Sequence, residues 1–216
     1  MNPTFGKTTA IAALALLLAT GLGAHDKGFG VSSFYFETRV GYEAAFPGMD
    51  FNADASGFRG SFLNMRLDGQ ICEGLTYSYR QRFNKLSGRT FFDATDWIHI
   101  DWKATDWFTL GGGKQVVGIG GYEYDRAPID LYYCSEFWNN IACYQLGISG
   151  TFNVAPGDNL LLQVCNSPMR GYITDDSGNN VGNSKVAVNL MWYGSHGFYE
   201  SIWSANAFQN STDSWM

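Results

Sequence analysis

The sequence has few of the features on which helical membrane proteins and common enzymes depend. Charged residues make up only 16% of the chain, and beyond the N-terminal segment no apolar run approaches the roughly 20 residues of a membrane-spanning helix. The sequence contains neither a CxxC pair nor a GxSxG motif. These absences argue against a helix bundle in the membrane, a thiol-rich zinc site and a hydrolase nucleophile elbow.

The charge balance and the few histidines exclude further classes. Lys and Arg number 14 against 20 Asp and Glu, so the acidic chain is a poor match for nucleic acid, whose phosphates require clustered cations. The histidines are His25, His99 and His196. A Ser-His-Asp arrangement is known on outer-membrane phospholipases, but nothing here marks a nucleophile. We therefore predict no enzyme and no cofactor.

The N-terminus reads as a secretory signal. Lys7 supplies a positive charge, residues 11–18 form an apolar run, and residues 21–24 are mostly small. This order predicts a signal peptide over residues 1–24 and a mature chain over 25–216. Cleavage after Gly23 places small residues, Gly23 and Gly21, at the first and third positions before the cut. Cleavage after Ala24 instead places Leu22 at the third position. The alternative is a buried N-terminal helix. Loss of Lys7 changes the formal charge from -6 to -7.

Export makes a disulfide chemically accessible to the four cysteines, Cys72, Cys134, Cys143 and Cys165. Cys134 and Cys143 are the closest pair and could close one loop, while the alternative leaves all four as thiols. None lies beside a histidine at metal-binding spacing, so we predict no metal site.

What the chain has in abundance is aromatic residues and glycine. Aromatics form 16% of the chain, with 12 Tyr and 7 Trp, and Gly numbers 26. Membrane β-barrels use such aromatics as interfacial girdles. Soluble β-sandwich lectins share this composition, so composition does not separate the two.

Apolar residues recur with period two in segments of about ten residues, the length of a tilted strand that crosses a bilayer. In the first segment Phe34, Phe36, Val40 and Tyr42 lie on one face, opposite Tyr35, Glu37, Arg39 and Glu43. The same alternation is found in segments 63–71, 75–84, 97–104, 144–152, 160–164 and 186–192. Segment 107–116 is glycine-rich with unclear faces, and 198–208 is less regular. We place Tyr144 on the apolar face with Leu146 and Ile148.

Long and short connections alternate between these segments. Residues 45–57, 86–93, 117–140 and 167–183 are the longer connections, and 72–74, 105–106, 155–158 and 195–197 are the short ones. Outer-membrane barrels have this parity, with short periplasmic turns and long outer loops. We therefore predict an all-β fold, an antiparallel up-and-down transmembrane β-barrel in the outer membrane. The alternative is a soluble periplasmic or secreted carbohydrate-binding β-sandwich.

The pattern yields about nine strands. Bacterial barrels have even strand numbers, and residues 209–216 are polar with no final strand. We expect that the sequence represents the N-terminal portion of an incomplete barrel.

A central block carries a family resemblance. Residues 111–126, with Gly113-Lys114 and Tyr122-Glu123-Tyr124, the segment Phe137-Trp138-Asn139-Asn140, and residues 79–84 resemble Bacteroidetes outer-membrane porins related to the phosphate-selective porin O and P family. The resemblance runs from about Ser33 to the end. It implies a sixteen-stranded barrel with a Gly-Lys pair before a long third loop, small hydrophilic solutes or anions as substrates, outer-membrane lipid as surroundings, and a homotrimer as the assembly of relatives.

The third long connection, residues 117–140, is a candidate constriction. In general porins the third outer loop folds into the lumen, and here it carries Glu123, Asp125, Arg126 and Asp130 among aromatic residues. The alternative is a loop that only packs on the barrel wall.

Cations on the polar faces are the candidate channel-lining groups. Arginine pairs suit phosphate and carboxylate anions because the guanidinium donates two parallel hydrogen bonds. The alternative is that these cations pair across strands with Glu37, Glu43, Asp68 and Asp101. The predicted channel-lining or anion-contacting residues are Arg39, Arg66, Arg80, Arg82, Lys103, Lys114 and Arg126.

Overall fold

The computed structural model describes residues 28–84, 90–126, 130–131, 133–169, 185–211 and 214–216. The predicted signal peptide, residues 1–24, lies outside this part of the chain. The strands are β1 Gly30–Ala45, β2 Asn52–Cys72, β3 Leu75–Arg82, β4 Thr95–Lys103, β5 Phe108–Val116, β6 Tyr144–Ala155, β7 Asp158–Asn166, β8 Val186–His196, β9 Tyr199–Ser211 and β10 Ser214–Trp215. The helices are α2 Tyr122–Asp125 and α3 Glu136–Asn140.

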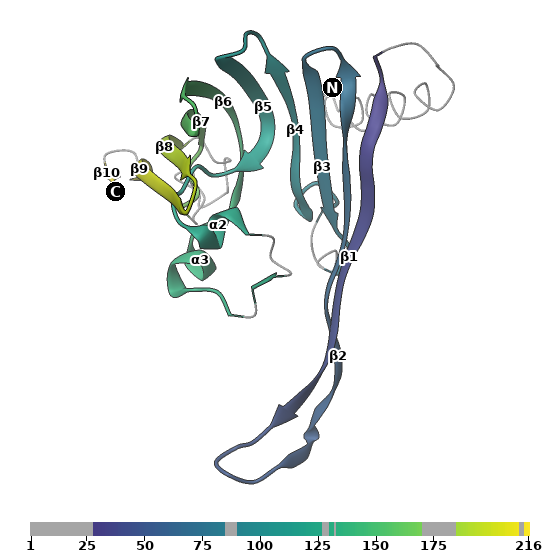
Figure 1. Cartoon of the computed structure of the whole chain (residues 1–216). Coiled ribbons are helices and arrows are strands. Elements are labelled where there is room, and N and C mark those ends of the chain that lie inside the picture. Colours follow the sequence, from purple (N-terminus) through teal and green to yellow (C-terminus); the bar gives the residue numbers. More distant parts are fainter. Residues whose placement is uncertain (1–27, 85–89, 127–129, 132, 170–184, 212–213) are drawn as a thin grey trace, which may run out of the picture.

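All ten described strands belong to one antiparallel sheet in which sequence order equals spatial order, β1 to β10. This up-and-down order confirms the predicted fold class. The sheet curves from β1–β3 on one side of the molecule to β6–β9 on the other, and the helices α2 and α3 lie near β6–β9 (Figure 1). Among the described strands β1 and β10 pair with β2 and β9 only, so the sheet is open.

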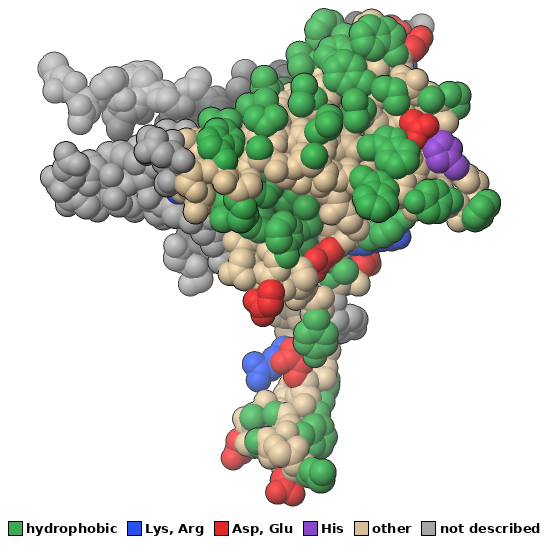
Figure 2. Space-filling view, turned by 90° about the vertical axis from the view of Figure 1, so that its left-hand side faces the viewer, with side chains coloured by type: hydrophobic (Ala, Val, Ile, Leu, Met, Phe, Trp, Pro, Cys, Tyr) green, Lys and Arg blue, Asp and Glu red, His purple; other side chains and the backbone are tan. Residues whose placement is uncertain are grey.

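Polarity in this sheet is inverted relative to a soluble protein. One face, here called the outward face, exposes apolar side chains: Ile148 is 61% exposed, and the set includes Phe34, Phe36, Val40, Ile100, Trp102, Leu110, Leu146, Leu162, Val164, Val188, Leu190 and Trp203. The opposite, inward face buries polar side chains, namely Glu37, Asn64, Arg80, Arg82, Asp96, Gln115, Ser149, Gln163 and Asn189. Figure 2, viewed from the side of β6–β9, shows hydrophobic side chains spread over the sheet.

This inversion separates the two fold classes that the sequence left open. A β-sandwich buries its apolar faces between two sheets, whereas the described strands form a single sheet with its apolar face exposed. A barrel in lipid has an apolar exterior and a polar interior. None of the helices in the described ranges is long and apolar enough to cross a bilayer.

The first connection differs from the prediction. We expected a long loop over residues 45–57, but β1 continues to Ala45 and β2 begins at Asn52. Residues 52–63 of β2 have no β3 partner and pair only with β1. At about 3.3 Å per residue, the 12 residues of β2 from Asn52 to Leu63 span at most roughly 40 Å. Figure 1 shows this two-stranded hairpin extending past the rest of the sheet. Cross-strand aromatic pairing, with Tyr42 and Phe58 at 5.3 Å between ring centroids, explains the extension.

The C-terminal residues also differ from the prediction. We expected nine strands and no strand after Phe208, but β9 continues to Ser211 and Ser214–Trp215 pairs with it as β10. The amide of Met216 donates to the carbonyl of Phe208 at 2.9 Å. Polar composition misled the prediction because strand pairing uses backbone groups that every residue except proline carries.

Tight turns join the strands at the end of the sheet opposite the hairpin. The turn between β6 and β7 consists of Pro156 and Gly157, and Gly157 has φ of 87°. Proline followed by glycine with positive φ is the pattern of a type II turn.

We expect Gly157→Ala to destabilise the folded protein by roughly 1–2 kcal/mol, the cost of a left-handed conformation for a residue with a Cβ. The new Cβ would also meet the carbonyl oxygen of Ser195. The fraction of folded protein is measured as a function of urea concentration on gels, where the folded form runs as a band that shifts when the sample is heated. Gly112→Ala is the matched control because nothing lies within 4 Å of its Cβ position, and equal midpoints for the two variants would contradict the prediction.

Candidate functional site

The long segment between β5 and β6 folds onto the inward face of the sheet. Near its start, the amide of Gly120 donates to Ser204 Oγ of β9 at 2.7 Å, and the Tyr122 hydroxyl donates to the carbonyl of Glu200 at 2.9 Å. Farther along, Arg39 Nη1 of β1 donates to the carbonyl of Leu131 at 2.9 Å. This segment, residues 117–143, therefore contacts both sides of the curved sheet, and we call it the inward loop.

Aromatic packing stabilises the inward loop. Tyr124 of α2 is buried and packs against Trp138 of α3, with 4.7 Å between ring centroids, and against Phe137. Burial raises the pKa of the Tyr124 hydroxyl, so this group stays neutral at physiological pH. The Ser135 hydroxyl caps α3 by accepting from the Trp138 amide. The loop therefore lies on the inward face, and its own aromatic residues pack against one another there. Its role as a constriction stays a prediction.

Opposite the inward loop, the inward face carries a charged network that we call the arginine wall: Arg66, Arg80 and Arg82 with Glu37, Asp68 and Asp96. Arg80, only 1% exposed, contacts Glu37 Oε2 through Nη2 and lies 3.6 Å from Asp96 Oδ2 through Nε. Arg82 donates to Asp96 Oδ2 through Nη2 at 2.8 Å and Nε at 3.2 Å. Arg66 donates to Asp68 at 2.9 Å. Arg80 and Arg82 thus pair with acidic groups on other strands, whereas Arg66 pairs with Asp68 on its own strand.

Aromatic rings hold the guanidinium groups in position. The Arg80 guanidinium lies 5.0 Å and the Arg66 guanidinium 5.4 Å from the Trp97 ring centroid. Arg66, Arg80 and Trp97 are register partners on the neighbouring strands β2, β3 and β4. The Arg82 guanidinium lies 5.9 Å from the Phe62 ring centroid. Cation–π contacts of this kind fix a guanidinium without consuming its N–H donors.

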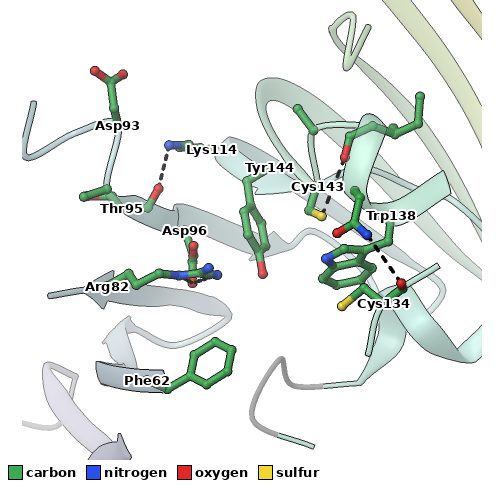
Figure 3. Close-up of a pocket in the computed structure, with 14 residues that line it drawn as sticks. Phe62, Arg82, Asp93, Thr95, Asp96, Lys114, Cys134, Trp138, Cys143 and Tyr144 are labelled. Atoms are coloured by element: carbon green, nitrogen blue, oxygen red, sulfur yellow. Dashed lines mark hydrogen bonds and ion pairs between the residues drawn. The ribbon is translucent and has the colours of Figure 1, made fainter. Parts of the chain in front are cut away.

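A cavity of about 480 Å³ separates the arginine wall from the inward loop. Arg82, Asp96 and Tyr144 line it on the wall side, and Cys134 and Trp138 line it on the loop side (Figure 3). The predicted outward position of Tyr144 is wrong, since its ring packs against Trp97 at 5.9 Å. Tyr144 is the first residue of β6 and pairs with Val116 in regular register, and its side chain lines the cavity directly after the loop.

Arg39 lies on the inward face near Arg82, since its guanidinium is 4.5 Å from the same Phe62 ring centroid. Lys114 and Arg126 lie farther from the wall. Lys114 points along the cavity rim, where its ammonium donates to the carbonyls of Thr95 and Phe92. Arg126 is exposed on the inward loop beside the Tyr122 ring.

Lys103 lies at the opposite end of the sheet. It pairs with Asp106 at 2.8 Å in the short β4–β5 turn, and this contact lowers the pKa of the Asp106 carboxyl. The structure therefore brings together Arg39, Arg66, Arg80 and Arg82, and leaves Lys103 away from them.

Sequence reasoning missed several residues of the site. Asp96 precedes the predicted segment 97–104, and Trp97 is only the first residue of that segment, although it contacts two arginines. A register shift between Arg80 and Gln81 turns Asp96 toward the arginines. Uncharged amides on the inward face, such as Gln163 and Asn189, were also overlooked. The signal that could have identified them is a polar residue between apolar neighbours in a predicted strand.

Comparison with known proteins agrees with this geometry. The family model described as phosphate-selective porin O and P matches residues 34–197. The chain belongs to this family. The matched region contains β2 to β8, the arginine wall and the inward loop, so the family assignment covers the whole candidate site. No curated protein matches the chain significantly, and the same holds for the solved structures.

Membership of this porin family agrees with the inverted polarity of the sheet. An exposed apolar face and a buried polar face are the arrangement of a channel wall in lipid. The inward loop, which contacts both sides of the sheet, contains the connection that the sequence marked as a candidate constriction.

Proposed function

We propose that this porin-family chain forms the wall of a passive diffusion channel for small hydrophilic solutes in the outer membrane. The observation that carries the proposal is the polar inward face, which places charged groups beside a cavity instead of an apolar core. Pore width and wall charge select solutes in such channels. The inward loop narrows the passage, and solutes pass between this loop and the arginine wall.

We further propose a preference for anions, with phosphate among them. Guanidinium groups recognise phosphate and carboxylate oxygens with two parallel hydrogen bonds. Arg82 lines the cavity beside the inward loop and Arg66 lines a second cavity on the inward face, which supports this preference. Because Glu37, Asp68 and Asp96 offset much of their charge, the preference is expected to be moderate.

Reversal potentials in planar bilayers under a KCl gradient test the proposal. The wild-type chain is expected to favour chloride over potassium, and phosphate should reduce the chloride current. A preference for potassium would contradict the proposed anion preference, and failure to conduct at all would contradict the proposed channel.

Arg82→Gln tests the contribution of the arginine wall. We expect the anion-to-cation permeability ratio to fall about two- to fivefold, the effect of roughly 0.5–1 kcal/mol of screened charge interaction. Arg82→Lys retains the charge and should largely preserve the ratio. Arg59→Gln is the matched control, because Arg59 lies in the exposed hairpin with Glu43. An equal ratio in Arg82→Gln and Arg59→Gln would argue against a selecting role for this wall.

A further inference from the structure

Three amide side chains stand in register on the inward face of neighbouring strands. Gln163 of β7 is the cross-strand partner of Asn189 of β8, which in turn is the partner of Asn206 of β9. Gln163 is 1% exposed and Asn189 is fully buried. Burial of uncharged amides is costly unless each group finds a hydrogen-bond partner. We call these three residues the amide row.

The amide row binds the beginning of the inward loop. The amide of Gly118 donates to Gln163 Oε1 at 2.8 Å, and Gln163 Nε2 donates to the carbonyl of Val116 at 2.9 Å. Asn206 Nδ2 donates to the carbonyl of Gly118 at 2.8 Å. Both backbone groups of Gly118 are therefore held by side chains of the sheet.

The three amides also bond to one another. Asn189 Nδ2 donates to Gln163 Oε1 at 2.9 Å, and Asn206 Nδ2 donates to Asn189 Oδ1 at 2.8 Å. The Ser204 hydroxyl donates to Asn206 Oδ1 at 2.6 Å and accepts from the amide of Gly120. These bonds form a continuous chain across three strands, and such chains are stronger than isolated bonds because each polarises the next.

Glycine allows the loop backbone to lie directly on the sheet. A Cβ on Gly120 would lie 2.7 Å from the backbone nitrogen of Ser204, closer than any real side chain. A Cβ on Gly118 would lie 3.0 Å from Leu161 Cδ2. The segment from Val117 to Gly120 is therefore shaped for this contact, with Val117 and Ile119 buried in an apolar cluster on either side of Gly118.

We propose that the amide row positions the inward loop and thereby sets the width of the passage. This inference rests on the proposed channel function, which it deepens by naming the residues that hold the constriction in place. Amides suit this task because each one both donates and accepts, so they fix a backbone without adding a charge that would trap a passing ion. Gln163, Asn189 and Asn206 are thus positioning residues, acting on solutes only through the loop.

Asn206→Leu is the test variant because leucine has the same number of side-chain heavy atoms and cannot hydrogen-bond. Hydrogen–deuterium exchange of the full chain in detergent should become about tenfold faster for the amides of residues 117–121, the effect of losing about 1.4 kcal/mol of local stability. Asn159→Leu is the matched control. Asn159 lies on β7, on the same face as Gln163 and four residues away. Equal exchange in the two variants would overturn the proposed anchoring.

Single-channel recording tests the second part of the inference. Asn206→Leu should raise the mean conductance and the open-channel noise and lower the anion-to-cation ratio, while Asn159→Leu should match the wild type. A retained heat-modifiable band shows that the variant is folded. Faster exchange with unchanged conductance and noise would overturn the link to passage width. A wild-type chain that does not conduct would overturn the proposed channel, and the exchange experiment would still decide whether the amide row anchors the loop.

Discussion

Replacing Arg80 by methionine is expected to destabilise the folded protein by about 3 kcal/mol, the cost of removing one partner from a buried ion pair. Arg80 is only 1% exposed and contacts both Glu37 and Asp96. Asp96 keeps Arg82 as a partner, but Glu37, which is 8% exposed, would keep, among the described residues, only the side-chain amide of Asn64 at 3.1 Å. The uncompensated Glu37 carboxylate therefore accounts for most of the expected loss.

The urea dependence of folding in detergent or lipid vesicles measures this loss. Arg59→Met is the matched control, since the Arg59–Glu43 pair at 2.9 Å has side chains 57% and 63% exposed. Exposed pairs of this kind contribute between 0 and about 1 kcal/mol. If both variants unfold at the same urea concentration, the arginine wall is not the buried network that its burial indicates. The double variant Glu37→Gln/Arg80→Met should recover part of the lost stability, because it removes the isolated carboxylate.

Placing arginine at Ile148 is expected to cost about 2–4 kcal/mol of folding free energy in a bilayer, the price of a cation near the middle of the lipid face. Ile148 lies in the centre of β6, is 61% exposed and belongs to the outward apolar face. Its cross-strand partners are Gly112 and Val164, so no carboxylate stands directly beside it. We expect less folded protein in lipid vesicles and in the outer membrane.

Thr151→Arg is the matched control for Ile148→Arg. Thr151 lies on the same strand but faces a cavity of about 320 Å³ under the inward loop, near Asp101 and His99. An arginine there remains hydrated and should leave folding nearly unchanged while raising the anion-to-cation ratio. If Thr151→Arg were the more damaging variant in lipid, the assignment of the two faces would have to be reversed.

The predictable part of the fold rests on local patterns. The alternation of Leu146 and Ile148 with Gly147 and Ser149 marked the two faces of β6, and Pro156-Gly157 marked the turn that follows. These signals need only neighbouring residues, because side chains alternate along any strand. The extension of β2 over residues 52–57 was missed, since glycine and polar residues there also suit a loop.

The candidate site was predictable only as a set of residue types. Arg80 and Arg82 are two residues apart and must share a face, so their common position followed from the sequence. Their partners did not, because Glu37 is 43 residues away in the chain and Asp96 turns inward at a register shift. The predicted cations Lys103 and Lys114 fell outside the wall, at a turn and at the cavity rim.

The sequence by itself determined that the chain is built from alternating strands with one apolar and one polar face, since period two is a local property of the backbone. Only the tertiary structure decided which charges meet, where the inward loop lies, and that a row of uncharged amides anchors it. Those features depend on cross-strand register and on contacts between residues far apart in the chain, such as Gly118 with Asn206. Local patterns do not encode such contacts, because each one exists only after the strands on both sides have paired.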